Sequence, residues 1–181
     1  MQFMMNEIRR AGYWSGAVTG SNALDNPFML GAANITISNA TGVTANSCIL
    51  YSYDGETING SVDEEEYYGF KLESSTIKIR YNVAGTSAAN LTCNAGSWEN
   101  ILDTDNIEIT ALTFSSANSQ CLNTSVSPPV SCTTTALTSG DTGVESREIQ
   151  ITLTGNVKND TDVEKTLISI VKVRNNRIYT E

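Results

Sequence analysis

The fold is decided by the stretch SREIQITLTGNVKNDTDVEKTLISIVKVR, Ser146 to Arg174. Residues 146–155 alternate apolar and polar side chains, which is the pattern of a strand with one buried face. Residues 164–174 form a second strand-like run that is apolar on both faces in its middle, so we expect it to lie centrally in a sheet. Residues 156–162 join the two runs. The stretch therefore predicts an antiparallel pair of long strands.

The rest of the chain adds further strand signals and one helix. The strand-like runs are NITIS (34–38), CILYSY (48–53), EEYYGFKLE (65–73), TIKIRYNV (76–83) and IEITALTF (107–114). Ser74 and Ser75 join two of these runs as a hairpin. The chain opens with apolar residues at helical spacing, namely Met1, Met4, Met5, Ile8 and Ala11. We expect one helix followed by seven or eight antiparallel strands, with residues 115–142 as a long loop.

Composition limits the functions that this chain can have. Its 181 residues predict a single globular domain, 1–181. A net charge of −9 argues against nucleic acid as a partner, because phosphate binding requires a basic surface. The chain has no histidine, which excludes a Ser-His-Asp or Cys-His site within it. No pair of carboxylates is marked out by spacing, so we expect no catalytic residue, no metal site and no cofactor.

The four cysteines, Cys48, Cys93, Cys121 and Cys132, favour two disulfides in an oxidising compartment. Three pairings are possible. Cys121 and Cys132 bracket a short loop and are the expected mates, which leaves Cys48 with Cys93. An oxidised chain has to be exported, and no signal peptide is visible. We therefore expect that the native N-terminus has been removed.

The acidic run DEEE, Asp63 to Glu66, is rich in the oxygen ligands that calcium prefers. Consecutive carboxylates point in different directions along a strand, and the spacing is not that of an EF-hand. We therefore favour a solvated loop tip over a calcium site, although the sequence does not decide between them.

Several segments, taken in order, resemble one known family. They are NEIRRAGYW (6–14), CILYSYD (48–54), YYGFKLESSTIKIR (67–80), GSWENILDTDNIEITALTF (96–114) and SREIQITLTGNVKNDTDVEKTLISIVKVRNNRI (146–178). Together they resemble the PilW-type minor pilins of type IV pili, and they are similar to the related GspJ-type minor pseudopilins. The resemblance implies an α+β fold, a pilin-like head with one N-terminal helix packed on mainly antiparallel sheets. It also implies that residues 1–12 are the remnant of a long helix whose hydrophobic half is missing.

The resemblance further implies a structural role. A minor pilin helps to prime pilus assembly and lies at or near the filament tip, with other minor pilins and the major pilin as partners. The full-length form would sit in the bacterial inner membrane and periplasm and then in the extracellular pilus. The partner interface would be the helix surface formed by Met1, Phe3, Met4, Met5, Ile8, Arg9 and Arg10. The alternative for the apolar stripe of this helix is packing on the chain's own sheet, and both can hold at once.

Two other functions remain open on the sequence. One is a minor pseudopilin at the tip of a type II secretion pseudopilus. The other, from a different class, is a free-standing extracellular adhesin or binding module. The sequence does not decide whether a pilus would serve adhesion, twitching motility or DNA uptake.

Overall fold

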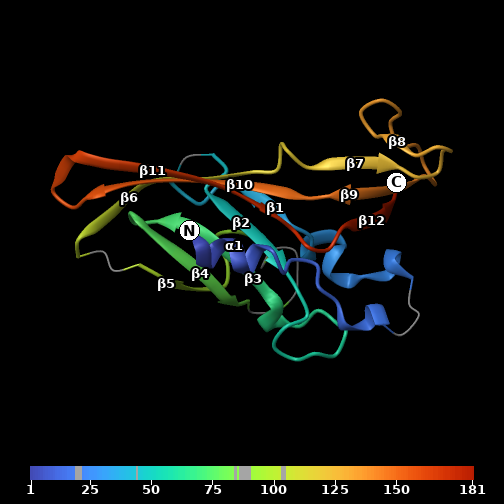
Figure 1. Ribbon diagram of the computed structural model, residues 1–181. Helices are drawn as coiled ribbons and strands as arrows, with labels where there is room; N and C mark the ends of the chain where they lie inside the picture. The colour runs from blue at the N-terminus through green and yellow to red at the C-terminus, as the bar shows by residue number, and fades with distance from the viewer. Residues whose placement is uncertain (19–21, 44, 84, 86–90, 103–104) are drawn as a thin grey trace.

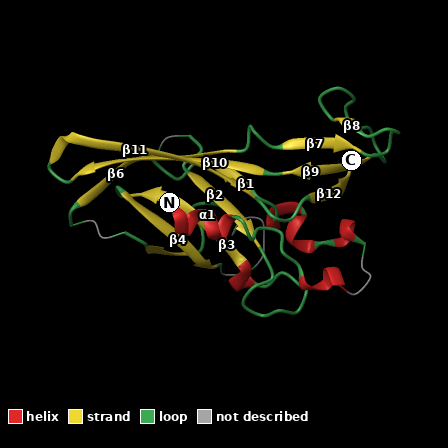
Figure 2. Ribbon diagram, in the orientation of Figure 1, coloured by secondary structure: helices red, strands yellow, loops and turns green. Residues whose placement is uncertain are grey.

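The computed structural model describes the chain except for residues 19–21, 44, 84, 86–90 and 103–104. Within the described residues the strands form three antiparallel sheets (Figures 1 and 2). The five-stranded sheet has the order β1 (Thr36–Ser38), β2 (Cys48–Ser52), β3 (Tyr67–Glu73), β4 (Thr76–Asn82) and β5 (Ser97–Asn100). The three-stranded sheet has the order β11 (Asp160–Lys172), β10 (Glu148–Val157) and β6 (Ile107–Ser115). The four-stranded sheet has the order β12 (Arg177–Thr180), β9 (Thr142–Ser146), β7 (Gln120–Asn123) and β8 (Val130–Ser131).

Helical structure is a minor part of the molecule. The described residues contain one short α-helix, α1 (Gln2–Ile8). The remaining helical segments are 3₁₀ turns: η1 (Ser15–Val18), η2 (Ala23–Asp25), η3 (Pro27–Met29), η4 (Gly31–Ala33) and η5 (Glu64–Glu66). Strands account for 43% of the described residues and helices for 13%. The predicted α+β class and pilin-like helix-on-sheet head are therefore wrong, because a helix of 7 residues is too short to form a layer over these sheets.

The hydrophobic core lies between two of the sheets. From the five-stranded sheet, Ile49, Tyr51, Phe70, Leu72 and Ile77 point into it. From the three-stranded sheet, Leu112, Phe114, Ile149, Ile151, Leu153 and Val171 meet them. Helix α1 adds Met4 and Ile8, which are 1% and 0% exposed. Two sheets facing each other thus bury each other's apolar faces, and α1 covers part of the same core. We call this region the body.

The long hairpin predicted from residues 146–174 is confirmed. Strands β10 and β11 pair antiparallel in continuous register from Glu148 opposite Lys172 to Asn156 opposite Glu164. The expected central position of the second strand is wrong, because β11 is at the edge of its sheet. Its two-sided apolar pattern instead leaves Ile168 and Ile170 64% and 50% exposed.

The other local predictions have mixed outcomes. The hairpin joined by Ser74 and Ser75 is confirmed, and both residues have positive φ, 52° and 57°. Positive φ at both central positions is the geometry of a tight two-residue hairpin turn that follows the strand twist. The long loop expected at 115–142 is wrong. It contributes β7, β8 and the start of β9 to the four-stranded sheet, whose strands are too short to show a sequence period.

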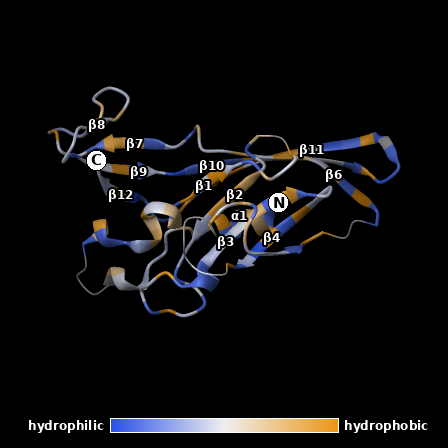
Figure 3. Cartoon of the chain, turned by 180° about the vertical axis from the view of Figure 1, so that it is seen from behind, coloured by the Kyte–Doolittle hydropathy of each residue, from blue (hydrophilic) through white to orange (hydrophobic). Residues whose placement is uncertain are grey.

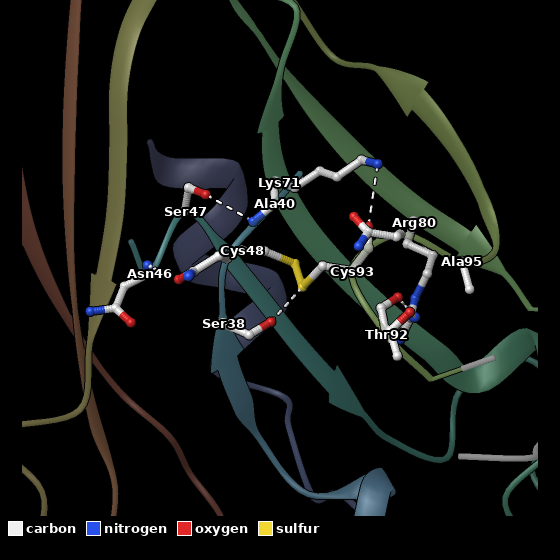
Figure 4. The surroundings of a disulfide bond; sticks show 12 residues. Ser38, Ala40, Asn46, Ser47, Cys48, Lys71, Arg80, Thr92, Cys93 and Ala95 are labelled. Atoms are coloured by element: carbon white, nitrogen blue, oxygen red, sulfur yellow. Dashed lines mark hydrogen bonds between the residues drawn. A yellow bond between two sulfur atoms is a disulfide. The ribbon is translucent and has the colours of Figure 1, made fainter. Parts of the chain in front are cut away.

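The structure contains both expected disulfides, Cys48–Cys93 and Cys121–Cys132. Cys48 and Cys93 are 0% and 2% exposed, and their bridge fastens β2 to the segment before β5. Figure 4 shows its surroundings, where the Lys71 ammonium donates to the Cys93 carbonyl over 3.3 Å. The second disulfide closes the β7–β8 loop at the opposite end of the molecule from the β10–β11 turn (Figure 1).

Candidate assembly interface

Helix α1 is fixed to the body by a row of aromatic rings. The row consists of Tyr51 on β2, Tyr53 just after β2, and Tyr68 and Phe70 on β3. The Tyr53 and Tyr68 rings are stacked, with 4.1 Å between their centroids. The Arg10 guanidinium lies 4.0 Å above the Tyr53 ring. These contacts hold the C-terminal end of the helix against the sheet through cation–π and ring stacking.

A polar contact completes this attachment. The Tyr53 hydroxyl donates to the Glu7 carboxylate over 2.7 Å, and Glu7 also lies 3.6 Å from the Arg10 guanidinium. Burial raises the pKa of Tyr53 well above its ordinary value, and the hydrogen bond to Glu7 raises it further. The phenol therefore keeps its proton and stays a donor throughout the physiological pH range. The helix is thus held in one orientation.

The predicted interface residues are divided between two sides of α1. Met4 and Ile8 face the chain's own core and are not available to a partner. Met1, Met5 and Arg9 are half-buried, and Arg10 is exposed. Phe3 is 50% exposed, and its ring meets the Phe70 ring edge-on at 5.9 Å. The helix therefore presents Phe3 as its large apolar side chain toward solvent.

An apolar groove lies beyond α1 on the same face of the three-stranded sheet. Its volume is about 320 Å³, and its floor includes Ile109 and Leu153, which also belong to the core. Large apolar side chains that are 36–54% exposed surround the floor: Leu102, Ile107, Val157, Val163 and Leu167. Figure 3 shows apolar segments on β6 and β11 at this end of the molecule. The groove continues the core past the point where α1 and the five-stranded sheet cover it.

Sequence reasoning missed this groove, although one signal for it was present. The apolar residues on both faces of 164–174 predict a central strand. The same pattern fits an edge strand whose apolar residues are left uncovered. Val157 and Val163 flank the β10–β11 turn and are a second signal for the groove. Apolar residues beside an exposed turn lie far from the core and remain exposed.

The acidic run does not gather into a ligand cage. Asp63 caps the 3₁₀ turn η5, and Glu66 is 0% exposed. The Glu66 carboxylate accepts from the backbone N–H groups of Gly55, at 2.8 Å, and Asp63, at 3.0 Å. Burial raises the pKa of this carboxyl. Across the described part of the chain, no group of three or more His, Cys, Asp or Glu side chains could hold a metal ion.

A scan against family models matches residues 1–173 to the family described as prepilin peptidase-dependent protein B. This chain belongs to that family. Membership relates the chain to type IV pilins and pseudopilins and associates it with pilus or pseudopilus machinery. The match does not point to PilW in particular. No curated protein and no solved structure matches the chain. Among the described helices, none has the length and apolar character needed to span a bilayer.

Proposed function

We propose that this protein is a minor pilin that helps to prime assembly of a type IV pilus and lies at or near the filament tip. Its partners would be other minor pilins and the major pilin, in the inner membrane and periplasm and then in the filament. Family membership supports the filament class. In this proposal residues 1–181 act as one globular unit without catalysis or a cofactor, and residues 1–12 belong to the assembly helix.

The observation that carries the proposal is the exposed apolar side chains at two sites, Phe3 on α1 and the rim of the groove. Exposed apolar side chains gathered at one place mark sites of protein–protein contact. Phe3 lies on the helix, and Ile107, Val163 and Leu167 rise from the neighbouring sheet. Such a surface suits a subunit that is held by packing against others, as in a filament, better than one that acts alone.

The test is carried out in the source bacterium with the native gene. Its deletion should remove most surface pili, counted by electron microscopy and in sheared-filament fractions, and the wild-type gene should restore them. Phe3→Arg should fail to restore pili while leaving the thermal stability of the purified chain close to wild type. Asn6→Arg, an equal charge change at an exposed position of the same helix, is the matched control and should restore them.

The alternative within the class is a minor pseudopilin of a type II secretion system. In that case the deletion would leave pilus number unchanged and abolish secretion of the system's substrates. If neither pili nor secretion changed, the filament role would be contradicted and a free-standing adhesin or binding module would take its place. Mass and N-terminal sequencing of the native protein from membrane and filament fractions would separate these cases independently.

A further inference from the structure

Strand β11 has a long backbone edge without a neighbouring strand. It is the outermost strand of the three-stranded sheet, and β10 lies on its other side. The Val173 N–H donates to the Arg147 carbonyl on the β10 side over 3.0 Å, whereas the Arg174 N–H donates to Arg9 on the opposite side over 3.1 Å. Because these directions alternate along an antiparallel strand, the even-numbered residues from Glu164 to Lys172 aim their backbone groups at the free edge.

This edge lacks proline, a bulge and short length, three of the features that usually prevent pairing, and its charges lie toward its ends, at Glu164, Lys165 and Lys172. Monomeric proteins protect such edges with proline, bulges, short strands or charged side chains. The β10–β11 register shifts only at Asn156 and Val157, near the turn, so residues 164–172 are regular. At the centre of this segment Ile168 is 64% exposed and Ile170 is 50% exposed, on the sheet face away from the core. The edge therefore offers both unpaired backbone and uncovered apolar side chains.

The charges along β11 are arranged to complement a second copy. Glu164 lies near one end and Lys172 at the other, both exposed and on the same face as Ile168. Neither makes an ion pair within the described chain. Antiparallel pairing of two copies about Ile168 places each Glu164 directly opposite a Lys172. Opposite charges across a strand pair stabilise it.

Other registers are less favourable. A shift by two residues in one direction pairs Asp162 with Lys172 but leaves Glu164 opposite the apolar Ile170. The shift in the other direction places Glu164 opposite Arg174. The Arg174 N–H is already bonded to Arg9, so the edge is covered there. The register centred on Ile168 is thus the one that uses the open edge and pairs Glu164 with Lys172.

We propose that two copies of this chain associate through β11, antiparallel and centred on Ile168, so that their three-stranded sheets join into one continuous six-stranded sheet. A two-fold axis through the pair of Ile168 residues gives a self-complementary contact. The proposal is separate from the pilus role, because Glu164, Ile168, Ile170 and Lys172 are neither part of α1 nor among the residues that line the groove.

Sedimentation velocity over a concentration series tests it. The wild-type chain should show a monomer–dimer equilibrium. Glu164→Lys and Lys172→Glu should each weaken dimerisation about tenfold, because each change turns two attractive contacts into repulsive ones. The combined swap, Glu164→Lys with Lys172→Glu, should restore it. Glu65→Lys, an exposed charge change far from β11, is the control and should have no effect. A monomer at all concentrations, or a dimer indifferent to these changes, would overturn the proposal.

Cross-linking tests the register itself. Two residues that face each other as a hydrogen-bonded pair have Cα atoms about 5.5 Å apart, within reach of a disulfide. Ile168→Cys should therefore give a covalent dimer on mild oxidation. In Ile170→Cys the two thiols would lie roughly 14 Å apart along the strands, and no covalent dimer should form. Equal cross-linking of both variants, or of Ile170→Cys alone, would contradict this register.

Discussion

The body and the β10–β11 turn end are built from the same strands but differ in what covers them. In the body Ile151 is 0% exposed, because Phe114 packs beside it on β6 and the five-stranded sheet lies over both. Toward the turn, Ile107 on β6 is 51% exposed, because the part of the five-stranded sheet that reaches this end of β6 is the β3–β4 turn, where Ser75 hydrogen-bonds to Glu108 and Ile109. One sheet thus provides both the core of the monomer and an uncovered apolar surface. The difference shows that burial here is set by the length of the covering layer and not by the strand sequence.

The largest expected effect concerns the disulfide of the body. Replacing Cys48 and Cys93 by alanine should lower the free energy of unfolding by about 4 kcal/mol, because the bridge closes a loop of 45 residues. Replacing Cys121 and Cys132, which are 11 residues apart, should cost about 3 kcal/mol by the same reasoning. Urea denaturation of both variants checks this order. A larger loss for the second pair would mean that the four-stranded sheet, and not the body, limits stability.

A matched pair of isoleucines tests the comparison directly. Ile151→Ala should cost about 3 kcal/mol, because the lost side chain leaves a cavity in a packed core. Ile107→Ala, in the same sheet, should cost less than about 1 kcal/mol, because its side chain is half in water. Equilibrium unfolding by circular dichroism gives both values. Equal losses would show that the groove is covered in solution.

Arg147 joins the body to the four-stranded sheet, between β9 and β10. It is 3% exposed and donates to the Asn34 side chain over 2.7 Å and to the Asn175 carbonyl over 3.0 Å. Burial lowers its pKa to about 10, so it remains charged at neutral pH. Arg147→Met should cost about 2 kcal/mol by leaving two half-buried acceptors without their donor. Thermal unfolding measures this loss, and an unchanged midpoint would show that the junction does not depend on Arg147.

The smallest expected effect is pH-dependent. Hydrogen bonds from Lys71 and Lys78 hold the pKa of Glu73 below its ordinary value. A lowered native pKa stabilises the fold above the unfolded-state pKa, and this contribution is lost as pH falls through the native pKa. Glu73→Gln should cost about 1 kcal/mol at pH 7, since the carboxylate is partly exposed, and the difference should disappear in acid. Glu65→Gln is the control. A difference that grows in acid would contradict this assignment.

The sequence by itself determined the local elements and the chemistry that the chain lacks. Strict alternation in 146–155 predicts β10, the Ser74–Ser75 turn predicts the β3–β4 hairpin, and the absence of histidine excludes histidine-dependent sites within the chain. Such features depend on neighbouring residues, and their period can be found in a single chain. The resemblance of its segments to minor pilins likewise pointed to the family class that the scan supports.

Only the tertiary structure decided how these elements cover one another. A two-sided apolar strand fits both a sheet centre and an uncovered edge, and Ile168 shows that the second applies here. The coverage of the core was also a tertiary matter, since Met4 and Ile8 of α1 are buried against it whereas no residue of α1 lines the groove. Burial depends on contacts between residues far apart in the chain, which no local period records. The surfaces proposed for assembly are therefore visible only once the sheets are in place.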